Sequence, residues 1–272
     1  MIDTHAHLSK RLCDIDRVIV EKIKKENIKV VLAASDIKDS SENIELNKEN
    51  KGDFFAAVGI HPQDTSPDVK LSIDEQLDLL DSMVKNNSDI VVGIGECGLD
   101  FSSAPPEERD RSKEEQEKLF RGQIELAIKY KLPLIIHARK AVDETVEILK
   151  EYKDLSGVFH CYAGGKKRIQ KILDLGKPPT ASQSWRSGWY FGIDGNLTYE
   201  DGLSEIVAKI PQERLILETD SPFLTPEPFR GQKNNSTNIK YIYAKVAEIW
   251  DKSFEETEKI IDENAKRLFK LV

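Results

Sequence analysis

The sequence has few cysteines and no long hydrophobic run. Its three cysteines, Cys13, Cys97 and Cys161, are far apart, and no Cys-x-x-Cys pair occurs. An odd, scattered set does not indicate a disulfide framework or a cysteine-type zinc site, and it fits a reducing compartment. No apolar stretch reaches the roughly 18 residues of a membrane helix, and no basic region precedes the first apolar run. We therefore expect a cytoplasmic protein without a membrane partner.

Positive charge is also in deficit. The chain has 40 Lys and Arg against 48 Asp and Glu, a formal net charge of −8. This balance argues against broad, non-specific wrapping of nucleic acid, because such binding neutralises many phosphates with basic side chains. It is compatible with a small local phosphate site, and with acidic charge that surrounds bound cations.

Two groups of catalytic and cofactor motifs are missing. Neither a P-loop nor a Gly-x-Gly-x-x-Gly fingerprint occurs, so no nucleotide cofactor is implied. No Gly-x-Ser-x-Gly elbow occurs either, which argues against a serine nucleophile.

What is present is an alternation of short β-branched runs with longer stretches of helical period, the pattern of repeated βα units. It predicts a (β/α)8 TIM-like barrel formed by one domain, residues 1–272, with two C-terminal helices split near Lys252 and Ser253. The expected strands lie near 1–5, 28–34, 54–60, 90–96, 133–137, 157–160 and 214–219, with an eighth at the aromatic run 189–191. The expected helices lie near 14–26, 40–50, 73–86, 112–131, 141–152, 165–175 and 201–210.

All five histidines lie at or just past the end of a predicted strand. They are His5, His7, His61, His137 and His160. In a parallel barrel the catalytic groups come from the C-terminal ends of the strands, so these side chains should converge on one pocket. Each histidine alone is more often a satisfied core residue, but the whole set favours metal ligands.

Two acidic residues follow strongly apolar runs in the same way. Glu96 follows 91–95 and Asp220 follows 215–217, with Glu218 on the same face as Asp220. A buried carboxylate needs a cationic partner, which is either a basic side chain or a metal. Two carboxylates and four histidines exceed the ligands of one tetrahedral zinc but suit two cations bridged by a carboxylate. The expected metal ligands are His5, His7, Glu96, His137, His160 and Asp220.

Three further residues are candidates for substrate contact. His61 is either a seventh ligand or a substrate contact, and Arg139 and Arg230 can bind phosphate oxygens through two hydrogen bonds each. The alternative for each arginine is an ordinary surface ion pair.

Taken together, these segments resemble the TatD-type metal-dependent deoxyribonuclease family, part of the amidohydrolase-like superfamily of barrels. The matching stretches cover nearly the whole chain: 2–8, 59–62, 95–100, 137–139, 160–161, 218–222, 230–231 and 264–269.

The resemblance implies two divalent ions, with magnesium as the usual working ion, although nitrogen and carboxylate ligands also suit manganese or zinc. It places one ion on His5, His7, Glu96 and Asp220, and the other on Glu96, His137 and His160. It directs the three substrate-contact candidates at the scissile phosphate of DNA. Activity in the family is often exonucleolytic, so single strands or strand ends are the expected partner.

The segment between Gly176 and Gly202 departs from the family pattern and carries Trp185, Arg186 and Trp189. We predict a loop over 177–188 and hypothesise that Trp185 or Trp189 stacks on a terminal base. In the catalytic hypothesis, Glu96 holds the metals and Asp220 accepts a proton from a metal-activated water. Two alternatives stay open: a two-metal hydrolase of an ester or amide, such as an aminoacyl-RNA deacylase, and a non-catalytic binding protein that keeps the metal.

Overall fold

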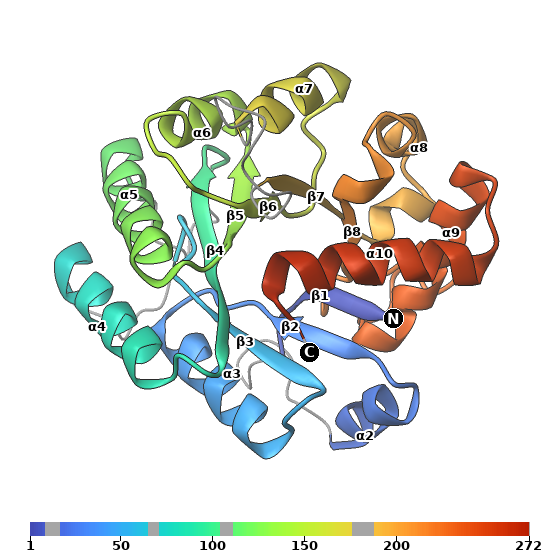
Figure 1. The fold of residues 1–272 in the computed structure, drawn as a ribbon, viewed down its shortest axis with the longest axis horizontal. Helices are drawn as coiled ribbons and strands as arrows, with labels where there is room; N and C mark the ends of the chain where they lie inside the picture. The colour runs from blue at the N-terminus through green and yellow to red at the C-terminus, as the bar shows by residue number, and fades with distance from the viewer. Residues whose placement is uncertain (9–16, 65–70, 104–110, 176–187, 272) are drawn as a thin grey trace.

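Eight parallel strands form one sheet in the order of the chain, from β1 to β8. In this computed structural model, which describes residues 1–8, 17–64, 71–103, 111–175 and 188–271, the sheet curls into a barrel (Figure 1). The end of the first strand meets the segment that follows the last strand through a parallel bridge between Ala6 and Ser221. The predicted barrel is confirmed. The strands are Ile2–Ala6, Lys29–Leu32, Phe54–Val58, Val91–Asp100, Leu134–Arg139, Gly157–Phe159, Trp189–Ile193 and Leu215–Leu217.

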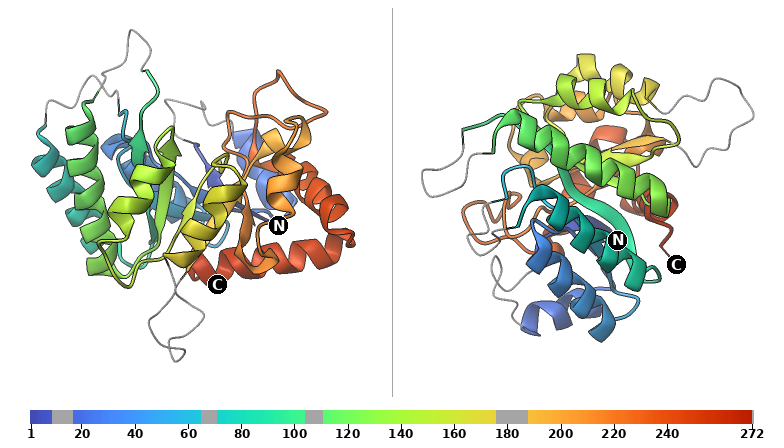
Figure 2. Two further views of the ribbon diagram at one scale, coloured as in Figure 1. Left: turned by 90° about the horizontal axis from the view of Figure 1, so that it is seen from above. Right: turned by 90° about the vertical axis from the view of Figure 1, so that its left-hand side faces the viewer.

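Helices connect the strands and surround the barrel (Figures 1 and 2). None of the described helices is long and apolar enough to cross a membrane. From α2 to α8 they are Arg17–Lys25, Ile37–Glu49, Ile73–Asn86, Lys113–Tyr130, Val142–Leu149, Lys166–Asp174 and Leu203–Val207. Short 3-10 helices occupy Gly195–Thr198, Gln212–Arg214 and Ser236–Asn238.

The C-terminal region forms the two expected helices, α9 at Ile239–Trp250 and α10 at Phe254–Phe269. The Ser253 side chain accepts a hydrogen bond from the Glu256 backbone, and the Glu256 carboxylate accepts one from the Ser253 backbone. This capping box satisfies two N–H groups that a helix start leaves unpaired, and it fixes where α10 begins.

The end of α10 closes one end of the barrel. Phe269 and Leu268 pack in a cluster with one buried residue from each of seven strands, among them Ile2, Val31 and Tyr190. Since this cluster is apolar and buried, the polar ends of the strands are left at the opposite mouth. The tail therefore occupies the end of the barrel opposite the polar strand ends.

One strand boundary differs from the prediction. The strand expected at 90–96 continues as β4 to Asp100, so Glu96 lies within it and not at its end. The continuation pairs with β5 through partners such as Gly98 and His137. A side chain at Gly98 would collide with the His137 carbonyl, so the missing Cβ allows this close pairing. A register shift between Ile94 and Cys97 accompanies it.

Candidate metal centre

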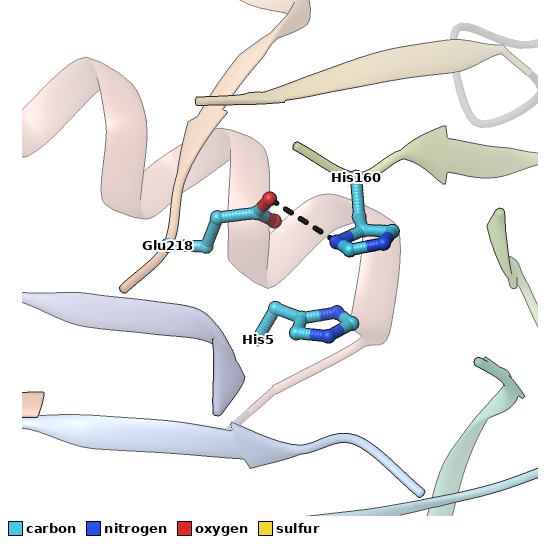
Figure 3. A group of neighbouring side chains, drawn as sticks. All are labelled: His5, His160 and Glu218. Carbon is cyan, nitrogen blue, oxygen red and sulfur yellow. Dashed lines mark ion pairs between the residues drawn. The ribbon is translucent and has the colours of Figure 1, made fainter. Parts of the chain in front are cut away.

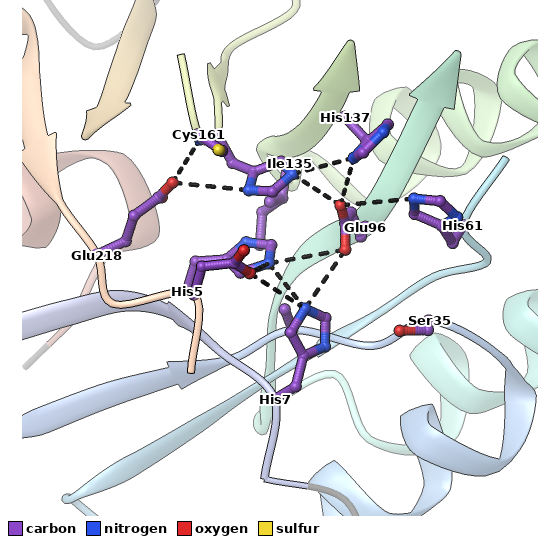
Figure 4. Close-up of polar contacts among 12 residues, drawn as sticks. His5, His7, Ser35, His61, Glu96, Ile135, His137, Cys161 and Glu218 are labelled. Carbon is purple, nitrogen blue, oxygen red and sulfur yellow. Dashed lines mark hydrogen bonds and ion pairs between the residues drawn. The ribbon is translucent and has the colours of Figure 1, made fainter. Parts of the chain in front are cut away.

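The five histidines meet around Glu96 at one mouth of the barrel (Figure 4). They come from β1, β5 and the segments that follow β1, β3 and β6. The predicted convergence of residues that are distant in the chain is thus present in the structure. Two groups of donor atoms can be separated, one on each oxygen of the Glu96 carboxylate.

The first group surrounds Glu96 Oε2. The Nε2 atoms of His5 and His7 lie 3.1 Å apart, and they lie 3.7 and 3.5 Å from Glu96 Oε2. Asp220 Oδ1 lies 3.5 Å from His5 Nε2 and 3.6 Å from His7 Nε2. Two nitrogens and two carboxylate oxygens therefore face a common point, as ligands of one cation do.

The second group surrounds Glu96 Oε1. His137 Nδ1 and His160 Nε2 each lie 2.7 Å from that oxygen and 3.2 Å from each other. His61 Nε2 is farther away, at 3.8 Å from Glu96 Oε1. The two oxygens of one carboxylate thus serve two different sets of imidazole nitrogens, which is the arrangement of a bridging ligand.

No lysine or arginine neutralises this carboxylate among the described residues, where all the ion-pair partners of Glu96 are histidines. Glu96 is 4% exposed. Burial opposes its charge, but His160 and His61 outweigh burial and hold the pKa of Glu96 well below its usual value. The simpler interpretation, a buried glutamate paired with a basic side chain, does not apply to this part of the chain.

The imidazoles fall into two electrostatic classes. Burial lowers the pKa of His5 to about 4 and that of His61 to about 3. Burial also disfavours the charged form of His7, His137 and His160, but nearby carboxylates outweigh it and raise their pKa values. A region that stabilises positive charge on three rings would stabilise cations in the same place.

The junction of β1 and β8 positions the first group. Asp3 accepts hydrogen bonds from the Thr219 backbone at 2.9 Å and the Thr219 hydroxyl at 2.6 Å, and the Asp220 backbone donates to His5 O at 2.9 Å. The His7 backbone donates to Ser221 O at 2.7 Å. The ladder of β1 also shifts register between Asp3 and Ala6, at the histidine motif. These bonds hold His5 and His7 beside Asp220.

Glu218 and His5 fix the orientation of His160 (Figure 3). The His5 and His160 rings are stacked, with centroids 4.1 Å apart and planes 7° from parallel. Glu218 Oε1 lies 3.6 Å from His160 Nδ1 and accepts a hydrogen bond from the Cys161 backbone at 2.5 Å. Burial raises the pKa of Glu218 to about 7. Glu218 therefore acts behind His160, on the ring nitrogen that faces away from Glu96.

A backbone hydrogen bond decides the tautomer of His61. The Gln63 N–H donates to His61 Nδ1 at 3.0 Å, so Nδ1 carries no proton. The neutral ring must then carry its proton on Nε2, the nitrogen that faces Glu96. A protonated nitrogen cannot bind a cation but can donate a hydrogen bond. Of the two roles expected for His61, this geometry favours substrate contact.

Asp100 also belongs to the site, although no role was expected for it from the sequence. Its Oδ2 lies 3.0 Å from His137 Nε2, and its Oδ1 accepts a hydrogen bond from the Ser102 backbone at 2.8 Å. Asp100 lies four positions after Glu96 along β4, so strand alternation could have suggested a shared face. The missing information was that the strand continues past Glu96.

The remaining sequence candidates have different outcomes. Arg139 is exposed at the end of β5, and Arg230 is exposed with its guanidinium 4.0 Å from the centre of the Tyr199 ring. The stacking role proposed for Trp189 is wrong: its side chain is 2% exposed and packs 5.5 Å from the Phe159 ring. Trp189 belongs to β7, the strand that was expected at the aromatic run 189–191. Trp185 and almost all of the predicted 177–188 loop lie outside the described residues.

The donor set fits divalent cations. Imidazole nitrogens lie 2.7–3.8 Å from the oxygens of Glu96. Among the described residues, no lysine or arginine forms an ion pair with this carboxylate. Three triads in this region have ligand atoms mutually within 4.8 Å: His5–His7–Glu96, His61–Glu96–His137 and His5–His160–Glu218. The hydrogen-bond pattern favours Glu96 and Asp220 with His5, His7, His137 and His160 as the cation-facing set.

Comparison with known proteins gives consistent results. A family model described as TatD related DNase matches residues 2–270. An uncharacterized metal-dependent hydrolase of Bacillus subtilis, YabD, is 35% identical, with 100% of this chain and 99% of that protein aligned. Human deoxyribonuclease TATDN3 is 30% identical, with 99% and 94% aligned. The crystal structure of the Escherichia coli TatD homologue YjjV has a TM-score of 0.83 at 25% identity, covering 100% of this chain and 98% of that one.

Proposed function

Because the chain belongs to the TatD-related DNase family of metal-dependent hydrolases, we propose that it is a deoxyribonuclease acting on single-stranded DNA or strand ends. The observation that carries the proposal is the divided Glu96 carboxylate, with one oxygen 2.7 Å from His137 and His160 and the other 3.5 Å from His7. The two sets of donors on this carboxylate would hold divalent cations, which would supply charge neutralisation for a phosphoryl displacement. The name of the human relative, a deoxyribonuclease, supports DNA as the substrate.

The residues of the site divide the chemistry between them. When bound, the cations would supply Lewis acidity and lower the pKa of the attacking water. Asp220 would accept the proton of that water: its pKa is kept low by His7 and His5 despite burial, so its carboxylate is ionised, with oxygens free of a proton, at neutral pH. The Nε2–H of His61 would donate to a phosphoryl oxygen.

Two exposed arginines are available for contact with a phosphate. Arg139 lies two residues beyond His137, and Arg230 lies on the segment after β8, braced by the Tyr199 ring. A planar guanidinium can bind two phosphate oxygens at once, which orients the diester as well as neutralising it. We therefore assign both arginines to substrate binding. A few such contacts are compatible with the net charge of −8, whereas extensive backbone wrapping is not.

The decisive experiment combines metal analysis with a nuclease assay on single- and double-stranded DNA. The expected result is bound divalent metal, and DNA cleavage that needs magnesium, manganese or zinc and stops with a chelator. Glu96→Gln is the variant that tests the role of the carboxylate, since it removes the bridging charge with almost no change in side-chain volume. Its activity should fall at least about 100-fold. Failure of the wild-type protein to cleave DNA with any of these metals would refute the proposal, and turnover of an ester or amide instead would support the rival chemistry.

A further inference from the structure

Phe223 is the most exposed aromatic side chain among the described residues, at 49% exposure. It lies three residues after Asp220, on the segment that follows β8. Its ring centroid is 6.3 Å from that of His7, with the two planes 68° apart. A flat apolar surface is therefore open to solvent directly beside the first group of donor atoms.

The backbone below this ring is firmly held. The Phe223 N–H donates to Asp220 O at 2.9 Å, and the Phe223 carbonyl accepts from Asn234 Nδ2 at 2.7 Å. Asn234, which is 2% exposed, also donates to Thr219 O at 2.9 Å and bonds through its own N–H to Pro222 O at 3.1 Å. The segment is thus fixed on both sides of Phe223 while the ring is left uncovered. An exposed ring on a fixed backbone is prepared for contact, because little order must be gained on binding.

We propose that Phe223 stacks on a base of the nucleotide next to the phosphodiester held at His7 and Asp220, an inference that rests on the proposed deoxyribonuclease function. A polar, cation-binding group beside a bare aromatic face matches the two parts of a nucleotide, its phosphate and its base. Stacking on a ring does not depend on base identity, since every base has a π face. It also provides affinity that needs no additional positive charge in a chain with a net charge of −8.

The test compares Phe223→Ala, Phe223→Leu and Phe223→Tyr with Leu79→Ala, a control at a 39% exposed position on α4. Two single-stranded oligonucleotides of equal length are used, one of normal DNA and one made only of abasic sugar phosphates. On normal DNA, Phe223→Ala should raise KM about 5- to 150-fold with kcat nearly unchanged. Phe223→Tyr should have the KM of the wild type. Phe223→Leu should raise KM almost as much as Phe223→Ala, because leucine has no ring to stack on a base. On the abasic strand, the wild type and Phe223→Ala should have equal KM values.

A second measurement does not need turnover. A cleavage-resistant phosphorothioate oligonucleotide containing 2-aminopurine is titrated with protein, and stacking should quench its fluorescence with wild type and Phe223→Tyr but not with Phe223→Ala. Equal quenching by all variants, or an equal KM increase on normal and abasic strands, would overturn the stacking role. If the wild type cleaves no DNA but quenches the fluorescence in a way that depends on Phe223, the nuclease function would be refuted and the base contact would still be supported.

Discussion

Asp100 Oδ2 lies 3.0 Å from Nε2 of His137, while Nδ1 of the same ring lies 2.7 Å from Glu96 Oε1. One imidazole is thus held between two carboxylates, one on each nitrogen. Asp100 favours a proton on Nε2, so that Nδ1 directs its lone pair at the metal centre once the ring has lost its second proton. Such a partner behind a metal ligand sets the tautomer and increases the basicity of the ring.

We therefore expect Asp100→Asn to weaken metal binding about 10- to 100-fold, because the amide cannot stabilise the same tautomer as well. Isothermal titration calorimetry with manganese measures the affinity. Asp74→Asn is the matched control, as this carboxylate is exposed and pairs with Lys118 outside the site. An unchanged affinity in Asp100→Asn would show that Asp100 does not position His137.

Asp220→Asn should lower kcat about 10²- to 10⁴-fold, because the amide cannot accept the proton of the attacking water. Asp220 also contributes an oxygen to the first group of donor atoms, within 3.6 Å of both His5 and His7. The metal content should therefore be lower than in the wild type, with the loss confined to one ion. Metal analysis and kcat on DNA, measured on the same preparation, test both effects, and an active Asp220→Asn protein would contradict the assignment.

Arg139→Ala should increase KM for DNA and reduce kcat/KM by roughly 10-fold or more, as expected for the loss of a charge-assisted contact of about 1.5–3 kcal/mol. Lys118→Ala, at an exposed position that pairs with Asp74, is a suitable control. Measuring hydrolysis of a neutral ester in parallel distinguishes the two chemistries, since a phosphate contact should not affect it. If cleavage of the phosphodiester is unaffected, Arg139 does not bind phosphate.

Cation binding should release protons, and the number should fall as pH rises. Although burial opposes it, Asp220 and Glu96 raise the pKa of His7, Asp100 and Glu96 raise that of His137, and Glu96 and Glu218 raise that of His160. These three rings are therefore protonated below their raised pKa values in the metal-free protein. A ligand nitrogen must lose its proton, hence affinity increases with pH until those values are passed. His5, with its pKa near 4, adds no release at neutral pH.

Calorimetry in two buffers of different ionisation enthalpy counts these protons at each pH. His160→Gln should release fewer protons than the wild type at pH 6. Proton uptake, or a release that grows between pH 6 and pH 8, would contradict the assigned charge states.

Phe269→Ala should destabilise the metal-free protein by about 3–5 kcal/mol, because it removes a large side chain from the cluster that closes the barrel. Chemical denaturation monitored by circular dichroism measures the change. Leu79→Ala, at an exposed position, should stay within about 0.5 kcal/mol of wild type. A comparably small effect of Phe269→Ala would mean that the tail does not stabilise the barrel.

Much of the site could be predicted from local patterns. His137 and His160 come at or just past the apolar ends of short strands, and parallel strands of a barrel bring such ends together whatever their distance in the chain. The start of α10 could also be predicted from the sequence, because Ser253 and Glu256 interact within a single turn. In these cases the deciding interaction is local, or it follows from the symmetry of the fold.

The tertiary structure decided what depends on partners distant in sequence. Trp189 looked available for a ligand in the sequence, but Phe159 on the adjacent strand buries it. The continuation of β4 to Asp100 required the close approach of β5 at Gly98.

The sequence by itself determined the barrel and the set of side chains at its mouth, because strand periodicity and residue type are properties of short segments. Only the folded chain decided which nitrogen of each ring faces the centre. Asp100 sets that choice for His137, and the Gln63 backbone sets it for His61. Hydrogen bonds are directional and short, so the orientation of a ring is fixed only once its neighbours are in place.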